Sequence, residues 1–288
     1  MPISVLMPAR NAQKTIKQAV KSTLDSLPAG AELLVLDDAS DDLTVTRLNE
    51  IADPRLHIFH NDTQSGVASS LNKLLASSTK SIVARMDADD ICLPWRFRAT
   101  RHHLEKVDFN FSTHLAFGTR PLRVMPSAPI GLNHKAISLS LLIENPLSHI
   151  TLDARRDSIM SAGGYRNTLA EDYDLWLRTV DHFSFAKRPI PTAMYRIHRG
   201  QSTALRAEWR MQALGTDEQR ESYFAHSARL GLSDPRWFKD WSAGNPVLEE
   251  DLRPLMNLIE EAWIDLPYQS RVNIAGRFER VFKRKLRL

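Results

Sequence analysis

Cysteine is almost absent from this sequence of 288 residues, in which Cys92 is the one example. A single cysteine excludes an internal disulfide framework and any zinc site built on cysteine, so a metal site would have to use Asp, Glu or His. The sequence also lacks a Gly-x-Gly-x-x-Gly fingerprint after its first apolar run and a Gly-x-x-x-x-Gly-Lys-Ser/Thr loop. These absences argue against dinucleotide-binding dehydrogenases and P-loop NTPases.

Long hydrophobic runs are also missing. No apolar stretch approaches the roughly 18–20 residues that a membrane-spanning helix needs. The first residues show no basic region followed by an apolar one, so we expect no signal peptide. With few cysteines and an ordinary hydrophobic content of 43%, the sequence predicts a cytoplasmic protein that meets the inner face of the cytoplasmic membrane, if at all, only at its surface.

Charge of one sign does not dominate, because the net charge is only +4. We therefore expect no nucleic-acid partner. The charge is uneven, however: residues 271–288 contain seven basic residues and one acidic residue, whereas residues 205–270 contain seven basic and twelve acidic ones. The basic character is thus concentrated in the last 18 residues.

Short apolar runs alternate with helical patterns in residues 1–90. The apolar runs, typical of strands buried on both faces, lie at residues 3–7, 33–36, 56–59 and 81–86. Helical spacing connects them, with Asn11 as the expected cap of the first helix. Strands that alternate with helices predict a parallel sheet with right-handed crossovers.

The rest of the chain is less regular. A helix is expected from Pro94, with Trp95 favoured as a core residue, and another helix over residues 171–182. Residues 118–134 contain several prolines and glycines, which favours a loop or an edge strand. Residues 205–288 are expected to be mainly helical.

Polar clusters follow three of the predicted strands directly, at Pro8–Asn11, Asp37–Asp42 and Asp87–Asp90. Ligands of open parallel sheets bind outside the carboxyl ends of the strands, so we expect the three clusters to share one crevice. So many carboxylates repel one another unless a cation or hydrogen-bond donors neutralise them. Mg²⁺ or Mn²⁺ with a phosphorylated ligand meets that need. A turn with a helix cap is the structural alternative for Asp37–Asp42.

The order and spacing of these segments resemble family 2 glycosyltransferases, which have the GT-A fold. The matching segments of the first half are Val5–Asn11, Leu36–Asp42, Gly66-Val67 with Asn72, Ala84–Asp90 and Leu93–Arg96. Those of the second half are Gly163–Arg166, Ala170–Arg178, Tyr195–His198 and Ser202. The resemblance covers residues 3 to about 203.

The resemblance implies an α/β fold of the GT-A type, with a mostly parallel sheet flanked by helices and a helical C-terminal extension. It implies a catalytic domain at residues 1–204, with a nucleotide-sugar half (1–96) and an acceptor half (97–204). Residues 205–288 would form a helical C-terminal region that ends in a basic amphipathic tail at 271–288.

The resemblance also implies a nucleotide-diphosphate sugar as donor, with UDP as the favoured nucleotide. In this interpretation Asp38 contacts the base, Arg85 faces the nucleotide, and Asp87 lies near the ribose and the donor sugar. The full set of donor-binding residues is Pro8, Arg10, Asp37, Asp38, Asn72, Arg85, Asp87 and Ala88. Arg10 departs from the pattern, because family members often have an aromatic residue there.

For the metal, the resemblance implies Mn²⁺ or Mg²⁺, with Asp89 as the ligand that meets the diphosphate and Asp87 beside it. His198 resembles a C-terminal histidine that reaches the metal in some GT-A enzymes. A structural role is the alternative, because imidazole is not the preferred ligand of hard cations.

Asp172 resembles the catalytic base of the family, with Glu171 as its neighbour. Transfer of a sugar needs charge stabilisation of the departing diphosphate and a group that accepts the proton of the acceptor hydroxyl. Attack opposite the leaving group predicts inversion at the anomeric carbon. The structural alternative is that Glu171 and Asp172 are acids placed favourably in the first turn of a helix.

The tail has helical periodicity, with Ile274, Phe278, Val281 and Phe282 on one face and basic residues around them. Such a helix can lie on an anionic membrane surface. The alternative is a terminal helix that docks on the body of the protein and keeps its basic face in water.

The sequence thus predicts an inverting, metal-dependent glycosyltransferase of bacterial polysaccharide or lipopolysaccharide synthesis, with a saccharide or lipid-linked acceptor. Two alternatives remain. One is a nucleotidyltransferase of similar sheet topology, which would usually carry a Gly-rich basic loop where Pro8–Asn11 stands. The other is a non-catalytic protein that recruits partners to a membrane through residues 271–288. The donor sugar, the linkage and the oligomeric state stay open.

Overall fold

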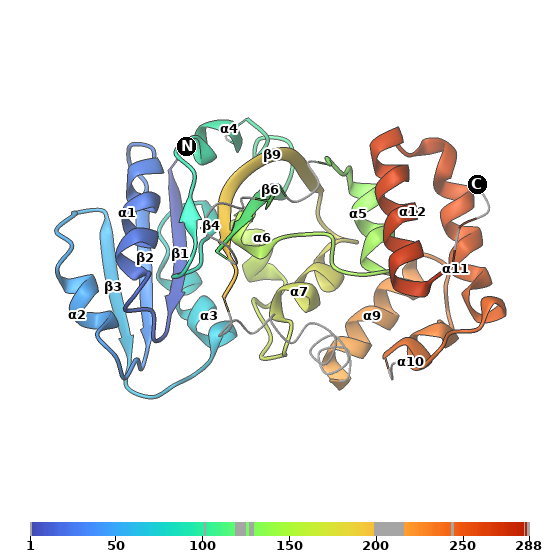
Figure 1. The fold of residues 1–288 in the computed structure, drawn as a ribbon, viewed down its shortest axis with the longest axis horizontal. Helices are drawn as coiled ribbons and strands as arrows, with labels where there is room; N and C mark the ends of the chain where they lie inside the picture. Colours follow the sequence, from blue (N-terminus) through green and yellow to red (C-terminus); the bar gives the residue numbers. More distant parts are fainter. Residues whose placement is uncertain are drawn as a thin grey trace. The chain divides into compact units, whose positions relative to one another are not determined.

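The computed structural model describes residues 2–100, 102–118, 125–126, 130–198, 216–242, 245–284 and 286. These residues form two compact units, coloured along the chain in Figure 1. The sheet unit comprises residues 1–129, 147–167 and 187–199, and the helical unit comprises residues 130–146, 168–186 and 200–288. The expected boundary at residues 204 and 205, Ser202 and the last residues of the tail lie outside the described residues.

Four parallel strands form the first half of the sheet, as predicted. In spatial order they are β3 (Leu56–Asn61), β2 (Glu32–Asp38), β1 (Ile3–Ala9) and β4 (Ile82–Arg85). The connecting helices are α1 (Ile16–Ser26), α2 (Thr44–Asn49) and α3 (Val67–Ser77). Because helices cover the sheet, β1 and β2 are buried almost throughout, which explains why both strands read as apolar runs.

The second half of the sheet is antiparallel where its register is defined. The strand β8 (Asp153–Arg155) pairs with β4, and the order then continues through β6 (Phe109–Phe117), β9 (Phe185–Arg196) and β5 (Ile91–Cys92), while β7 (Met125–Pro126) pairs with β6. Short helices α4 (Arg96–Thr100) and α6 (Arg156–Ser161) and the 3-10 turn η1 (His149–Thr151) complete the sheet unit. Of these later strands, β7 lies in the segment 118–134, for which the sequence favoured a loop or an edge strand; the sequence did not predict the other four.

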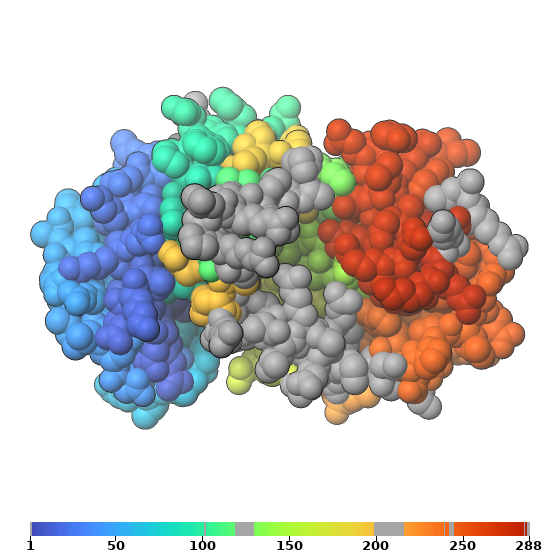
Figure 2. Space-filling view, in the orientation of Figure 1, coloured from blue at the N-terminus to red at the C-terminus, as the bar shows by residue number. Residues whose placement is uncertain are grey.

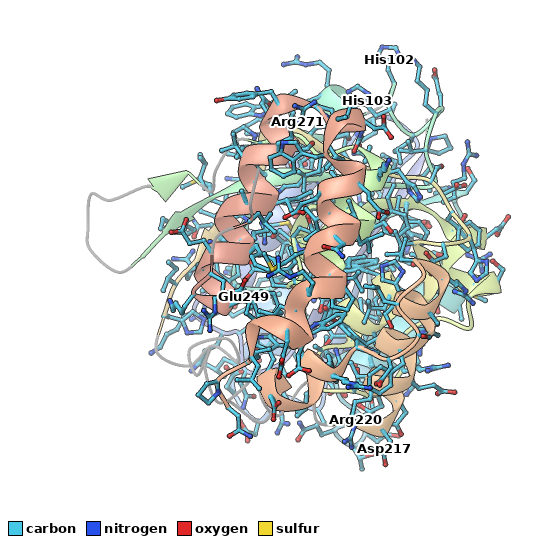
Figure 3. All side chains as sticks on the ribbon, turned by 90° about the vertical axis from the view of Figure 1, so that its right-hand side faces the viewer. His102, His103, Asp217, Arg220, Glu249 and Arg271 are labelled. Atoms are coloured by element: carbon cyan, nitrogen blue, oxygen red, sulfur yellow. The ribbon has the colours of Figure 1, made fainter. Side chains whose placement is uncertain are left out.

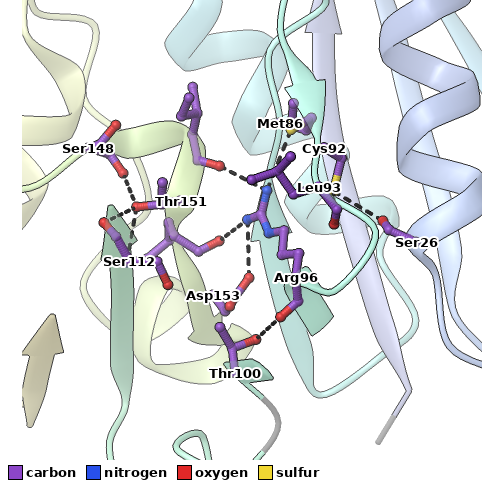
Figure 4. Close-up of polar contacts among 12 residues, drawn as sticks. Ser26, Met86, Cys92, Leu93, Arg96, Thr100, Ser112, Ser148, Thr151 and Asp153 are labelled. Carbon is purple, nitrogen blue, oxygen red and sulfur yellow. Dashed lines mark hydrogen bonds and ion pairs between the residues drawn. The ribbon is translucent and has the colours of Figure 1, made fainter. Parts of the chain in front are cut away.

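A buried ion pair ties the two halves of the sheet unit together (Figure 4). Arg96, at the start of α4, is fully buried, and its guanidinium lies 3.1 Å from the buried carboxylate of Asp153 in β8. The same guanidinium donates hydrogen bonds to the backbone carbonyls of Ile150 at 2.9 Å and Leu152 at 3.0 Å. Since β8 neighbours β4, this cation fixes the strand that leads to the acidic segment 87–90.

Seven described segments build the helical unit. They are α5 (His134–Leu141), α7 (Glu171–Thr179), α9 (Asp217–Arg229), α10 (Arg236–Ser242), α11 (Glu249–Ala262), η3 (Trp263–Asp265) and α12 (Tyr268–Phe282). The core holds fully buried aromatic residues, among them Trp176 and Trp237. In Figure 3 Glu249 and Arg271 lie at opposite ends of the pair α11 and α12, and Arg284 after α12 returns to within 3.7 Å of Glu249. The prediction of a mainly helical C-terminal region is confirmed for the described residues.

The apolar face of α12 packs inside the helical unit, where Ile274 and Phe278 are fully buried and Phe282 is nearly so. Each of these side chains contributes about 2 kcal/mol through burial in the helical unit, and α12 would have to separate from that unit before the same side chains could enter a bilayer. The apolar face of α12 therefore agrees with the alternative in which the terminal helix docks on the body of the protein. Other apolar side chains remain exposed just before and at the start of the helix, with Ile264 of η3 at 84% and Tyr268 of α12 at 78%. They belong to the region coloured red in Figure 2.

No helix among the described residues combines the length and the apolar character needed to cross a bilayer.

Two local predictions were wrong. Asn11 does not cap the first helix: α1 begins at Ile16 after Thr15, and Asn11 has a left-handed backbone with φ +49°. Trp95 is not a core residue, since it is 38% exposed, and its indole N–H donates to the carbonyl of Pro191 at 2.8 Å. In both cases a partner far along the chain decides the conformation, and local sequence patterns do not reveal it.

Candidate functional site

The three predicted polar clusters lie at the carboxyl ends of β2, β1 and β4, and β1 stands between the other two strands. In the register, Ala9 of β1 is opposite Asp37 of β2, and Leu6 is opposite Arg85 of β4. The loops after β1 and β2 are also tied together, because the Asn11 N–H donates to Ser40 Oγ at 2.9 Å and the Asp41 N–H donates to Asn11 Oδ1 at 3.1 Å. The expected shared edge is therefore present.

Asp38 organises the loop that leads into α3. Its Oδ1 accepts hydrogen bonds from Asn61 Nδ2 at 2.6 Å and from the Ser65 N–H at 2.8 Å and Oγ at 3.0 Å. Its Oδ2 accepts the Gly66 N–H at 2.8 Å. Burial opposes ionisation, but these donors outweigh it and hold the pKa of Asp38 below its usual value. Asp38 thus builds the site, and Oδ2 keeps lone-pair capacity for a ligand.

Asp37 offers a different kind of acceptor. Its Oδ2 accepts the Ser40 N–H at 3.1 Å, whereas its Oδ1 is buried and has no hydrogen-bond partner among the described residues. A buried carboxylate oxygen without a donor is costly. Such an oxygen favours a bound molecule that brings a donor to this edge of the sheet.

Asp87, Asp89 and Asp90 bring three carboxylates together, with one oxygen from each within 4.8 Å of the others. Burial, followed by the charges of Asp87 and Asp89, raises the pKa of Asp90 to about 9. Its Oδ1 accepts the Arg196 N–H at 2.7 Å, while its Oδ2 is buried without a partner in the described part of the chain. Hard oxygen ligands at this density fit Mg²⁺ or Mn²⁺, which would relieve the mutual repulsion.

Basic side chains surround this acidic cluster. The guanidinium of Arg85 is almost buried and lies 2.5 Å from Asp87 Oδ1, and it also donates to the carbonyl of Met86. His198 Nε2 lies 2.9 Å from Asp89 Oδ2, and Arg196 Nε donates to the Asp89 carbonyl at 2.7 Å. The structure therefore brings together Asp87, Asp89, Arg85 and His198. Whether His198 ligates a metal stays a prediction.

Sequence reasoning did not assign Asp90 and Arg196 to the site. Both residues lie inside the segments that resemble the family, Asp87–Asp90 and Tyr195–His198, so the sequence could have indicated these two positions. What the sequence could not show is that Arg196 returns across the sheet from β9 to fasten the acidic segment.

Asn72 holds a neighbouring loop rather than pointing freely outward. Its Oδ1 accepts the Tyr165 N–H at 2.9 Å, and its Nδ2 donates to the Tyr165 carbonyl at 2.8 Å. A Cβ at Gly164, where φ is +71°, would lie 2.5 Å from Asn72 Oδ1, so this contact requires glycine. Asn72 also lines an open cavity of about 390 Å³ with Ser69, Lys73 and Asn167. Its contact with a donor stays a prediction.

The remaining predicted donor residues sit at the strand ends without a specific contact that defines a role. Arg10 is exposed, Pro8 is partly exposed, and Ala88 is 8% exposed.

Asp172 and Glu171 open α7 in the helical unit, so both acids lie in the first turn of a helix. Asp172 Oδ1 accepts a hydrogen bond from the N–H of Tyr173 at 2.7 Å, and Asp172 Oδ2 accepts one from Asn145 Nδ2 at 3.0 Å. Donors to both oxygens and the helix N-terminus favour the ionised carboxylate. An ionised, oriented carboxylate is chemically able to accept a proton.

A family model matches this chain. Residues 4–143 match the model described as Glycosyl transferase family 2.

Two curated relatives are similar over about two thirds of this chain. The protein named "Putative glycosyltransferase EpsE" of Bacillus subtilis (strain 168) is 29% identical over 209 residues, which cover 68% of this chain and 72% of the relative. The UDP-Glc:alpha-D-GlcNAc-diphosphoundecaprenol beta-1,3-glucosyltransferase WfaP of Escherichia coli is 26% identical over 210 residues, which cover 70% and 80%.

Two solved structures share the fold. Residues 1–349 of S. aureus TarS in complex with UDP-GlcNAc superpose with a TM-score of 0.63 at 15% identity, over 98% of this chain and 91% of that one. The mannosyltransferase PcManGT from Pyrobaculum calidifontis, in complex with GDP-Man and Mn²⁺, gives a TM-score of 0.60 at 15% identity, over 95% and 78%. The GT-A fold expected from the sequence is thereby confirmed.

Proposed function

This chain belongs to glycosyltransferase family 2, and from that premise we propose that it moves a sugar from a nucleotide-diphosphate sugar to an acceptor hydroxyl, with inversion and with a divalent cation. That it is a glycosyltransferase follows from the family and the relatives. The finer statement is carried by one observation: three carboxylates within 4.8 Å of one another follow the same sheet edge that bears Asp37 and Asp38.

Asp87, Asp89 and Asp90 would hold Mn²⁺ or Mg²⁺, since all three offer hard oxygen ligands. Such a cation supplies charge stabilisation to a diphosphate leaving group. Arg85 keeps Asp87 in place, and Arg196 keeps both Asp89 and Asp90 in place. The Mn²⁺ named with PcManGT supports this choice of ion.

The nucleotide would lie along the ends of β1 and β2. Asp37 Oδ1 is the buried acceptor that lacks a donor, and Asp38 Oδ2 retains lone-pair capacity beside it. The N–H groups of a nucleobase and the hydroxyl groups of a ribose are donors that suit these oxygens. The UDP-sugars in the names of WfaP and the TarS complex support UDP as the nucleotide.

Asp172 would accept the proton of the acceptor hydroxyl. Asn145 and the Tyr173 N–H fix the orientation of its carboxylate, so it acts by position more than by basicity. Glu171 precedes it in the same helical turn. Attack on the anomeric carbon from the side opposite the diphosphate inverts the configuration.

A lipid-linked acceptor is the class we favour, because the name of WfaP specifies a diphosphoundecaprenol-linked saccharide. We propose bacterial polysaccharide or lipopolysaccharide synthesis as the pathway, which the name of the O-antigen biosynthesis glycosyltransferase WbnJ of Escherichia coli supports. We place the reaction at the inner face of the cytoplasmic membrane, where basic residues of 271–284 can attract anionic lipids. The family membership argues against both alternatives, the nucleotidyltransferase and the non-catalytic binding protein.

The test combines donor binding with transfer. A thermal-shift screen of UDP-, GDP-, dTDP- and CMP-sugars, each with Mn²⁺ or Mg²⁺, identifies the donor. Transfer is then measured as nucleotide release with GlcNAc-diphosphoundecaprenol as acceptor. We expect Asp172→Asn to bind the donor like the wild type and to lose at least about 100-fold in kcat.

Asp157→Asn is the matched control, because Asp157 also lies in the first turn of a helix, α6, but is exposed. It should retain full activity. Full turnover of Asp172→Asn would remove Asp172 as the base, and the absence of any stabilisation by a nucleotide sugar would overturn the proposed function itself.

A further inference from the structure

We infer that the helical unit positions the Asp172 carboxylate through Asn145, and that α12 secures Asn145 by clamping Glu144. This inference rests on the proposed function, because it takes Asp172 as the base. It gives the basic C-terminal helix a role inside the enzyme, in addition to any contact with lipids. All of the residues involved belong to the helical unit.

Asn145 makes the direct contact. Its Nδ2 donates to Asp172 Oδ2 at 3.0 Å, while the Asp172 Oδ1 accepts the N–H of the following residue. The terminal torsion of a carboxylate has a broad energy minimum, so each donor on it narrows the range of orientations. With a donor on each oxygen the plane of the carboxylate is fixed. Asn145 is therefore a positioning residue for the base.

The turn that carries Asn145 follows α5 and is held by side chains from two other helices. The hydroxyl of Tyr173 in α7 donates to the carbonyl of Leu141. The hydroxyl of Tyr223 in α9 donates to the carbonyl of Leu142 at 2.7 Å. These are C-terminal carbonyls of a helix, which have no partner within their own helix. Both tyrosines thus fix the path of the backbone just before Asn145.

The clamp from α12 holds the residue next to Asn145. Glu144 is largely buried, and Arg277 Nη1 donates to its Oε1 at 2.5 Å, while Arg280 donates to the same oxygen. Arg277 is itself fixed, since its Nε donates to Asn273 Oδ1 at 2.7 Å on the preceding turn. A buried carboxylate that loses its cations must move toward water or take up a proton. Movement of the carboxylate toward water would displace the backbone of Glu144 and with it Asn145.

This arrangement has a kinetic consequence. A misplacement of about 1 Å at a reacting group costs up to about 100-fold in rate. Loss of the Asn145 donor or of the clamp should therefore lower kcat and leave donor binding unchanged, because no residue of this chain of contacts belongs to the acidic cluster or to the Asp37–Asp38 edge.

The first experiment measures Asn145→Ala with the donor found in the thermal-shift screen and GlcNAc-diphosphoundecaprenol as acceptor. We expect kcat to fall by roughly 10- to 100-fold, the KM for the donor to stay within about 2-fold, and the acid limb of the pH profile of kcat to move to higher pH, because a donor that favoured the ionised carboxylate is gone. Asn145→Asp should be worse still, since it places a like charge against Asp172. A pH profile and a kcat equal to those of the wild type would overturn the inference.

The second experiment tests the clamp by a double-variant cycle. Arg277→Gln keeps the size of the side chain and removes its charge, and we expect kcat to fall by roughly 10-fold. Because it acts through Asn145, Arg277→Gln combined with Asn145→Ala should be no slower than Asn145→Ala alone. Effects that multiply would contradict the route through Asn145. The control is Arg253→Gln, which removes a cation of the neighbouring helix α11 whose partner is Glu249, and it should leave kcat unchanged.

Parallel measurements distinguish a loss of the fold, a wrong assignment of the base and a wrong assignment of the positioning role. Arg280→Gln serves as a milder variant, because that side chain is 59% exposed, and thermal unfolding of each variant shows whether the fold is kept. If Asp172→Asn retains turnover, the assignment of the base is wrong. If Asp172→Asn is inactive while Asn145→Ala and Arg277→Gln both match the wild type, the assignment stands and only the positioning role is wrong.

Discussion

Replacement of Arg96 by methionine should destabilise the sheet unit more than any exposed substitution. The guanidinium is fully buried and serves three acceptors, the Asp153 carboxylate and the carbonyls of Ile150 and Leu152. Methionine fills a similar volume without a donor. The change therefore leaves a charged group and two carbonyls without their partner in the protein interior.

The magnitude follows from the burial of the pair. Breaking a buried ion pair from one side costs about 3–5 kcal/mol, because the remaining charge is uncompensated. At about 2–4 °C per kcal/mol for a domain of 150–250 residues, the melting temperature should fall by roughly 6–20 °C. Burial already raises the pKa of Asp153 against the opposing charge of Arg96, and without Arg96 the pKa rises further. The folded variant then favours the protonated acid, so its deficit should shrink as the pH falls toward the unfolded value near 3.9.

Urea unfolding at pH 7.5 and pH 5, followed by tryptophan fluorescence and by far-UV circular dichroism, measures this effect. Coincident transitions are required before a free energy is assigned. The double variant Arg96→Met with Asp153→Leu should recover most of the loss, since both charged partners are then replaced by apolar groups. A single variant within about 0.5 kcal/mol of the wild type, or a double variant less stable than Arg96→Met, would refute the reasoning.

Three further predictions concern carboxylates. Asp38→Asn brings an amide toward the N–H groups of Ser65 and Gly66, so it should cost about 2 kcal/mol in thermal unfolding and raise the donor KM. Because hydrogen bonds lower the pKa of wild-type Asp38, its stabilisation is present above the unfolded value near 3.9 and is lost as the pH falls through the lower folded value. The pKa of Asp90 is raised to about 9, so the carboxyl of Asp90 must lose its proton before a cation can bind all three carboxylates. The affinity for Mn²⁺, measured by calorimetry, should therefore increase from pH 6 to pH 9, and Asp90→Asn should flatten that increase. His226→Gln should lose about 2 kcal/mol in urea unfolding, since the buried His226 ring lies 3.0 Å from both the Asp181 carboxylate and the Ser138 carbonyl. A loss below about 0.5 kcal/mol would contradict a stabilising role of these two contacts.

The parallel half of the sheet was predictable because burial on both faces leaves a direct mark on the sequence. The run at 33–36 is apolar without interruption and the run at 3–7 is interrupted only by Ser4, and both became central strands. The polar clusters after them were predictable for the same reason, since parallel strands end at one edge. The sequence could not separate the roles of Asp37 and Asp38. Only the structure shows that Asp38 accepts hydrogen bonds from the 61–66 loop on both of its oxygens, while Asp37 Oδ1 is a buried acceptor without a donor among the described residues.

Other features depend on partners that local patterns do not contain. A lone arginine such as Arg96 is expected at the surface from its sequence context, and only the structure shows its buried partner Asp153. Asn145 carries no local signal, because its partner Asp172 comes 27 residues later. The periodicity of the tail predicted the helix and its apolar face correctly, yet it could not distinguish a membrane from the interior of the helical unit, since both accept apolar side chains equally.

The bond from Arg196 to Asp90 has a consequence for the order in which this enzyme is made. The two residues are 106 positions apart in the chain, and the second bond of Arg196, to Asp89, spans 107. During synthesis the ribosome releases β1 to β4 long before β9, so the parallel strands can pair while the acidic segment is still unfastened. Contacts of such sequence separation form slowly. The arrangement of the three carboxylates that we propose as a cation site should therefore be among the last features that the sheet unit acquires.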